Sequence, residues 1–401
     1  MADTATKSRS LKRPAAPPSN TKRLKKPGFF NAKSGFDMPF FVIVLILVVV
    51  GLIVMFSASY PSAYYYKGNS YAYFLPQLRS VIIGIGAMIV VSFVDYRQLR
   101  RFAYVVFAIS VVLLIAVLIV PSEGDVKRWM TIGIQFQPSE IAKFATILIL
   151  ACWTSTHSES MDKFKEGVLL PCVFVAITCA LLLLEPHYSC IAIILILTMV
   201  MLFLSGVKGI YFIVGIGAVA ALFAILYSTG ALAGYLEKKF SGWGTALTYI
   251  NDDQWQNQTW QTRNSLYAIG SGGLLGLGPG QSRQKHLFLP EPQNDFIFAI
   301  VCEELGFIGA LVILLAFAYL VYRGIRVCMR APDIFGRLLG TGLCAQIGLQ
   351  VILNVLVITD CLPNTGISFP FFSYGGTSMI MLLMQMGVVL SITRSARAEK
   401  M

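Results

Sequence analysis

The chain has 401 residues, of which 56% are hydrophobic and only 13% charged, and its mean hydropathy is +0.70. Soluble domains carry about 25% charged residues, so this composition excludes a soluble globular protein. The apolar residues come in runs long enough to cross a bilayer as helices. Because lipid cannot satisfy open backbone groups, we expect an all-α polytopic membrane protein.

Residues 1–37 precede the first apolar run and are rich in Lys, Arg and Pro. This composition predicts a disordered basic tail in the cytosol. We expect the tail to anchor the topology and to attract anionic lipid weakly, rather than to bind nucleic acid.

Ten apolar runs then predict about ten transmembrane helices. Their expected ranges are 39–59, 78–95, 102–120, 139–154, 167–184, 190–205, 209–228, 296–321, 338–358 and 371–393. Basic residues concentrate in the tail and in every second connection, so the positive-inside rule places both termini in the cytosol. The transmembrane domain then covers 38–395, residues 396–401 form a cytosolic C-terminus, and 229–295 form one long extracytoplasmic loop before the eighth helix.

Two groups of residues read most simply as structural. The tyrosines of the outer segment 60–77 are typical of an interfacial belt. The eight cysteines form no Cys-x-x-Cys pair and the three histidines are scattered, so neither predicts a metal site.

Ionisable residues inside or beside a span are functional candidates by default. Glu140 and Lys143 are three residues apart in the fourth span and share one helix face if Pro138 lies in the first turn. A structural ion pair and a functional role are equally open for them. Upstream, Arg128 next to Trp129 places a cation on the outer side, where the pair by itself indicates anchoring.

The long loop contains the glycine-rich segment SLYAIGSGGLLGLGPGQSRQK. A dinucleotide-binding fingerprint would need a βαβ context, which is absent. We expect a mixture of two properties: a flexible loop, and backbone that approaches a bulky ligand closely. Arg283 and Lys285, which follow, would then face anionic groups.

The segment FLPEPQNDFIFAI joins this loop to the eighth span and carries Glu291 and Asp295. Helix capping accounts for Asp295 alone. Glu303 and Glu304 lie further along the span, where they would pair with Lys143 or another basic group, or stay neutral. A partly desolvated carboxylate at the membrane mouth also has the properties of a general base.

The segment GISFPFFSYGGTSM supplies hydroxyl groups near the last span, including those of Ser373 and Tyr374. We expect Pro370 to mark the entry to that helix. Periodicity leaves open whether these side chains form a polar helix seam or the wall of a ligand site.

Three segments in this order resemble the SEDS family (shape, elongation, division and sporulation), which includes FtsW, RodA and SpoVE. They are RWMTIGIQFQPSEIAKFA, the stretch from SLYAIGSGG to CEELGFIGA, and LPNTGISFPFFSYGGTSM. The resemblance covers nearly the whole chain from residue 38. PEPQNDFIFAI and the long basic tail are more similar to FtsW or SpoVE than to RodA. The chain departs from the family pattern Gln-Pro-Asp-x-Gly, where it has Glu185-Pro-His-Tyr-Ser189.

The resemblance implies a peptidoglycan glycosyltransferase that polymerises lipid II on the outer face of the bacterial cytoplasmic membrane. It implies that Asp295 is the essential acid and marks Glu140 and Lys143 as functional. It further implies a class B penicillin-binding protein as the transpeptidase partner, among other divisome or elongasome membrane proteins. An FtsW-like role in cell division is favoured, with a RodA-like role in elongation as the alternative.

The expected reaction inverts the configuration at the anomeric carbon of the donor sugar, because the donor bond is α and the new bond is β. By analogy with inverting glycosidases, it needs a base on the acceptor hydroxyl and positive charge near the leaving diphosphate. We assign Asp295 as the base.

The other predicted site residues support binding or charge. They are Lys143 and Arg128 as the first candidate cations, Arg283 and Lys285 as the next, Glu140 as the partner of Lys143, Glu303 and Glu304 as electrostatic support for Asp295, and Glu291, Ser373 and Tyr374 around the substrate. No dedicated metal cage is visible, and a divalent cation (Mg²⁺ or Mn²⁺) held by oxygen ligands and phosphates is left open.

A lipid II flippase or another transporter is the rival interpretation, since interior charges suit transport as well as catalysis. A transporter would more readily place its site at the midplane on broken helices, whereas these acids cluster toward the outer side.

Overall fold

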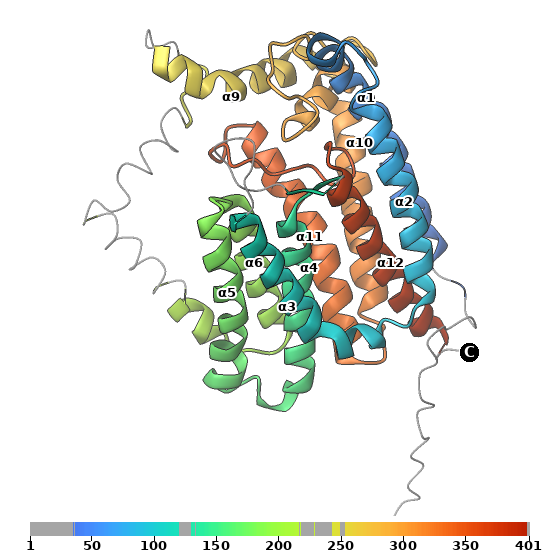
Figure 1. The fold of residues 1–401 in the computed structure, drawn as a ribbon, viewed down its shortest axis with the longest axis vertical. Coiled ribbons are helices and arrows are strands. Elements are labelled where there is room, and N and C mark those ends of the chain that lie inside the picture. Colours follow the sequence, from blue (N-terminus) through green and yellow to red (C-terminus); the bar gives the residue numbers. More distant parts are fainter. Residues whose placement is uncertain are drawn as a thin grey trace, which may run out of the picture.

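The computed structural model describes residues 35, 37–119, 130–132, 134–215, 217, 228, 243–248 and 253–398. Most helices run side by side along the long axis of the molecule, and one lies across an end of the bundle (Figure 1). The predicted tail falls almost wholly outside the described residues. The fold class predicted from the sequence, an all-α polytopic membrane protein, is confirmed.

The helices and strands follow one another in chain order with short connections. They are α1 Met38–Lys67, α2 Phe74–Phe93, α3 Arg97–Ile119, β1 Met130–Ile132, β2 Ile134–Phe136, α4 Pro138–Thr156, η1 Ser158–Ser160, the π-helix η2 Lys165–Leu169, α5 Leu170–Leu184, α6 Tyr188–Leu204, α9 Asp253–Gly272, α10 Ile297–Cys328, α11 Ile334–Ile358 and α12 Gly376–Ala398. The two strands pair antiparallel, with Met130 opposite Phe136.

Within the described residues, seven helices are long and apolar enough to cross a membrane: α1, α2, α3, the continuous η2–α5 helix, α10, α11 and α12. The predicted fourth and sixth spans correspond to α4 and to α6, which is apolar but has 17 residues. The predicted seventh span, 209–228, lies mostly outside the described residues. The total of ten therefore stays a prediction.

Three helices form the centre of the bundle. Within the apolar windows of α11 and α12, 61% and 78% of the residues are buried, against 28–39% for the other five spans. α4 is also buried along most of its length and contacts α3, α6 and α11. The outer helices expose their apolar side chains, as expected for faces that contact lipid.

Asp37 fixes one end of the bundle. Its side chain caps α1 by accepting a hydrogen bond from the Phe40 N–H, and it forms a two-pronged ion pair with Arg323 of α10. Its own N–H donates to Thr393 near the end of α12. The start of α1 and the end of α12 thus lie together, which agrees with both termini being on one side of the membrane.

Two predicted boundaries are wrong. Residues 60–67, expected in an outer loop, continue α1 until Gly68, which ends the helix in the left-handed conformation. No breaker precedes Gly68 except Pro61, which the helix tolerates. The last helix begins at Gly376 rather than near Pro370, because Phe371 has a positive φ and residues 370–372 form a turn. The predicted break between α5 and α6 at Pro186 is confirmed.

The glycine-rich segment packs its backbone directly on α10, which corrects the expectation of a flexible or ligand-facing loop. Leu277 and Gly278 donate N–H bonds to the carbonyls of Glu303 and Glu304 at 2.9 and 3.0 Å. Phe307 in turn donates to Gly273 at 2.9 Å. This pairing interrupts α10 at Gly306, whose φ of 67° and ψ of −173° are open essentially only to glycine.

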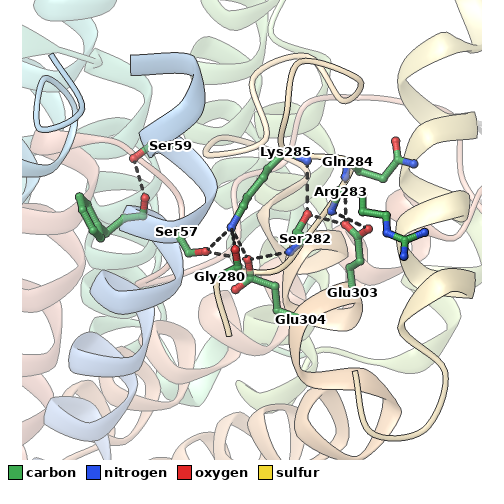
Figure 2. Close-up of polar contacts among 10 residues, drawn as sticks. Ser57, Ser59, Gly280, Ser282, Arg283, Gln284, Lys285, Glu303 and Glu304 are labelled. Atoms are coloured by element: carbon green, nitrogen blue, oxygen red, sulfur yellow. Dashed lines mark hydrogen bonds and ion pairs between the residues drawn. The ribbon is translucent and has the colours of Figure 1, made fainter. Parts of the chain in front are cut away.

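Beside this break, Glu303 and Glu304 hold the loop in a buried polar network (Figure 2). Lys285 is fully buried, and its ammonium donates to Glu304 at 2.9 Å, to Ser57 of α1 at 3.0 Å and to the Gly280 carbonyl at 2.6 Å. Glu303 accepts from the backbone N–H groups of Arg283 and Gln284 and from the hydroxyl groups of Ser271 and Ser282. We call residues Ser57, Ser282, Lys285, Glu303 and Glu304 the loop clamp. It ties the long loop to α1 and α10.

Gly306→Ala tests the close backbone pairing. A Cβ atom at Gly306 would lie 2.3 Å from the backbone nitrogen of Gly276. The glycine-only conformation adds about 1–3 kcal/mol of strain. We expect a melting temperature lower by several degrees in detergent. Gly270→Ala in α9, where a Cβ would meet nothing within 4 Å, is the control and should melt like the wild type. Equal melting of both variants would contradict the pairing.

Lys285→Met tests the loop clamp. The variant leaves Glu304 buried without its counter-charge, and breaking such a pair costs about 3–5 kcal/mol. We expect a clearly lower melting temperature, partly restored in the Lys285→Met/Glu304→Gln double variant. A single variant as stable as the wild type would show that the ion pair does not hold the loop.

Candidate functional site

A cavity of about 530 Å³ opens at the end of the bundle where α4, α6 and the break before α12 meet. Most of its lining comes from four short segments separated by long distances in the sequence. They are the start of α4 with Glu140 and Lys143, the turn and first residues of α6 from His187 to Ile193, the loop before α10 from Glu291 to Asp295, and residues 366–382 before and within α12.

Asp295 lies at the cavity directly before α10 and is partly exposed. The helix cap itself is Phe296, which makes no side-chain capping bond, so capping does not explain Asp295. The buried amide of Asn354 donates to the carbonyl groups of Asp295 and Ile367 at 2.7 and 2.6 Å, which fixes both segments against α11. A Cβ atom at Gly366 would lie 3.1 Å from Oδ2 of Asp295, so the backbone there approaches the carboxylate closely.

Ser373 and Tyr374 join the loop before α10 to the turn before α12. The Ser373 hydroxyl accepts from the Phe369 N–H at 2.7 Å and donates to the Asn294 carbonyl at 2.8 Å. The Tyr374 N–H donates to the carbonyl of Gln293 at 2.8 Å. These bonds give Ser373 a positioning role, whereas the ring of Tyr374 lines the cavity.

Glu140 and Lys143 form a buried ion pair at 2.8 Å, with side chains only 5% and 4% exposed. Pro138 begins α4, so both residues share a face as predicted. Among the described residues no hydrogen-bond donor reaches Oε2 of Glu140. The pair thus brings a charged amine and an acceptor oxygen to the cavity.

The rim of the cavity is aromatic and carries a second amine. The Lys67 ammonium lies 4.4 Å from the ring centre of Tyr73, and the rings of Tyr73 and Tyr374 meet edge to face at 5.2 Å. Burial raises the pKa of Tyr73, and the charges of Glu291 and Tyr66 raise it further. Burial also raises the pKa of Tyr374, so both phenols stay neutral and can donate hydrogen bonds at neutral pH.

The structure brings six of the predicted site residues to this cavity: Asp295, Glu140, Lys143, Glu291, Ser373 and Tyr374. It does not bring Lys285, Glu303 and Glu304 there, because they belong to the loop clamp and are satisfied by one another. Arg283 lies outside the cavity too, with an exposed side chain. The structure thus places Glu303 and Glu304 away from the cavity, and their expected electrostatic support of Asp295 stays a prediction. Arg128 lies outside the described residues.

Sequence reasoning missed several lining residues, chiefly Lys67, Tyr73, Gln137, His187 and Gln350. Lys67 could have been found from the lack of a helix breaker between residue 62 and Gly68, which carries α1 out to the rim. His187 comes from the segment that departs from the family pattern. Gln350 could have been found too, because Gln346, Gln350 and Asn354 recur every four residues and place a row of amides on one face of an apolar helix.

In the described ranges, no three His, Cys, Asp or Glu side chains come together as ligands for a metal ion. Asp295 and Oε2 of Glu140 supply oxygen atoms that could serve as metal ligands at the same cavity. A divalent cation would therefore need most of its ligands from a bound substrate.

Known proteins match the chain over most of its length. The FtsW/RodA/SpoVE family model, described as "Cell cycle protein", matches residues 37–398. The stage V sporulation protein E of Bacillus subtilis is 36% identical over 375 residues, covering 91% of this chain and 99% of the relative. The probable peptidoglycan glycosyltransferase FtsW of Trichlorobacter lovleyi is 34% identical over 366 residues, covering 89% and 93%.

Two solved structures share the fold. A chain from a study of the structural coordination of polymerization and crosslinking by a peptidoglycan synthase complex has a TM-score of 0.74 at 24% identity, covering 90% of this chain and 98% of the other. The rod shape determining protein RodA of Thermus thermophilus has a TM-score of 0.64 at 25% identity, covering 90% and 97%. The resemblance predicted from the sequence is confirmed: the chain belongs to the FtsW/RodA/SpoVE (SEDS) family of multi-pass bacterial membrane proteins.

Proposed function

We propose that the chain is a peptidoglycan glycosyltransferase that polymerises lipid II in this cavity, with Asp295 as the general base. One observation carries the proposal: a carboxylate and a buried ammonium–carboxylate pair, from distant parts of the sequence, line a single cavity. The names of the sequence relatives support the same activity.

Asp295 meets the requirements of a base that acts on a sugar hydroxyl. It is partly exposed at the cavity, and its backbone is held by Asn354. In the proposed step the carboxylate takes the proton from the acceptor 4-hydroxyl as that oxygen attacks the anomeric carbon of the donor. The bond from this carbon to the lipid diphosphate breaks with inversion, and the diphosphate leaves with the electron pair.

Positive charge near the leaving diphosphate stabilises the transition state. Lys143 supplies this charge from a buried position, where screening by water is weak and the interaction is strong. Glu140 holds the Lys143 amine in place. Lys67 at the rim is the second cation of the described lining and would meet a diphosphate nearer the surface. If Mg²⁺ or Mn²⁺ takes part, Asp295 and Glu140 would hold it, and it would supply further charge for the leaving group.

We infer the biological role from the sequence features that are more similar to FtsW than to RodA. We propose a division role with a class B penicillin-binding protein as the transpeptidase partner, among other divisome membrane proteins. A RodA-like role in elongation with elongasome partners is the alternative. The fold likeness to a chain of a peptidoglycan synthase complex supports assembly with a cross-linking partner.

Asp295→Asn tests the base directly. The amide keeps the size of the side chain but cannot take the proton, and removing a general base lowers rates by about 10²–10⁴-fold. We expect wild-type protein with its partner, whose transpeptidase is blocked, to form glycan from labelled lipid II. The variant should form almost none while melting normally. Full activity of the variant would exclude Asp295 as the base. If wild type formed no polymer but moved lipid II across vesicles, the flippase interpretation would hold instead.

Lys143→Met tests the buried cation, with Lys285→Met as its matched control. Both variants remove a buried ammonium that lies 2.8 or 2.9 Å from a glutamate, so both should lower stability. Activity per folded molecule at low temperature separates them. We expect Lys143→Met to lose at least about tenfold in the rate of polymerisation. Lys285→Met should lose clearly less, because Lys285 does not line the cavity and affects the rate only through the position of the long loop. Equal losses in the two variants would assign Lys143 a structural role only.

A further inference from the structure

A series of tyrosine rings leads from the cavity to the outside. Tyr374 and Tyr73 line the cavity and meet edge to face at 5.2 Å. Tyr66 directly precedes Lys67 in α1, and the Lys67 ammonium lies 4.4 Å from the ring centre of Tyr73. Tyr66 and Tyr65 meet edge to face at 5.0 Å. The rings thus continue from the cavity onto the open surface of the last turn of α1.

The outer two rings are much more exposed than a packing role requires. The exposed fractions of Tyr65 and Tyr66 are 69% and 70%. An edge-to-face pair leaves at least one face of each ring uncovered by its partner. Open aromatic faces next to a polar cavity are typical of a binding surface.

The length of α1 places these two positions outside the hydrocarbon core, where their ring faces can meet polar solutes as well as headgroups. Its 30 residues extend about 45 Å at 1.5 Å per residue, whereas the hydrocarbon core of a bilayer is about 30 Å thick. Asp37, bonded to Arg323, starts the helix at one polar boundary. Tyr65 and Tyr66 then lie about 40 Å along the helix, beyond the opposite edge of the hydrocarbon.

We propose that Tyr374, Tyr73, Tyr66 and Tyr65 form an aromatic track that binds the growing glycan strand as it leaves the cavity. The track rests on the proposed function, because that reaction makes a polymer which has to leave the site. Sugar rings present flat faces of C–H groups that pack on aromatic faces, and the tyrosine hydroxyls can bond to sugar hydroxyls. Successive rings suit a repeating polymer, since each repeat meets a similar surface.

Lys67 fits this assignment. Its ammonium lies over the Tyr73 ring in the middle of the track. A glycan strand with peptide stems carries carboxylates, which an exposed amine attracts.

Sugar binding can be measured without polymerisation. The probe is chitohexaose, a β-1,4-linked N-acetylglucosamine oligomer, titrated by saturation-transfer NMR against the full chain in lipid nanodiscs. We expect Tyr65→Ala/Tyr66→Ala to bind it about tenfold more weakly than wild type, since two ring contacts are lost. Tyr65→Phe/Tyr66→Phe keeps the rings and should retain most of the binding.

Tyr267→Ala is the matched control, since this tyrosine is 49% exposed in α9 at the same end of the molecule. It should bind like wild type. Equal binding by wild type and the double alanine variant would overturn the track, as would absence of binding by wild type. If that variant bound sugar normally but entered vesicles less efficiently, the tyrosines would be an interface belt and the proposal would be wrong.

Glycan length gives a second readout. We expect the double alanine variant to release strands severalfold shorter than those of wild type and of Tyr267→Ala, because the strand is held less firmly between additions. Unchanged strand length would overturn the track while leaving the glycosyltransferase assignment intact. Conversely, ring-dependent sugar binding by a chain that forms no polymer would contradict the proposed function and not the track.

Discussion

A charge buried among apolar helices costs several kcal/mol unless a partner compensates it, and this constraint shapes the molecule at two places. The Lys285–Glu304 pair is surrounded by further hydrogen-bonding groups from α1 and the long loop. Its charges therefore stabilise the contact between these segments. The Glu140–Lys143 pair retains an acceptor oxygen and faces a cavity. Two pairs of the same chemistry therefore have different roles, and the difference lies in how completely each is satisfied.

The Lys285–Glu304 pair helps to position the cavity that the Glu140–Lys143 pair faces. The loop clamp and the backbone pairing at Gly306 fix where the long loop returns to the bundle, and Asp295 comes directly after that loop. Asn354 then holds Asp295 and Ile367 on α11, while Ser373 ties the turn before α12 to the same loop. Residues from four separate parts of the sequence thereby converge on one cavity.

Local patterns predicted the helices well, because a run of apolar residues determines a membrane helix almost by itself. The i, i+3 spacing of Glu140 and Lys143 and the break at Pro186 were likewise readable from adjacent residues. Contacts between residues far apart in the sequence could not be predicted in this way. Nothing near Glu303 or Glu304 indicates that Ser282 and Lys285 fold back onto them, so their acidity suggested catalytic support. The glycines of the long loop suggested mobility, whereas their close approach to α10 depends on where that helix breaks.

The break at Gly306 also divides α10 into a short first part beside the long loop and a long membrane-spanning part. A continuous helix would transmit any change of its tilt to its first residue, and spans tilt when their length does not match the local membrane thickness. Here residues 307–328, about 33 Å of helix, can adjust to the lipid, while residues 297–305 follow the long loop. We therefore expect the geometry around Asp295 to respond less to hydrophobic mismatch than it would at the start of a continuous helix.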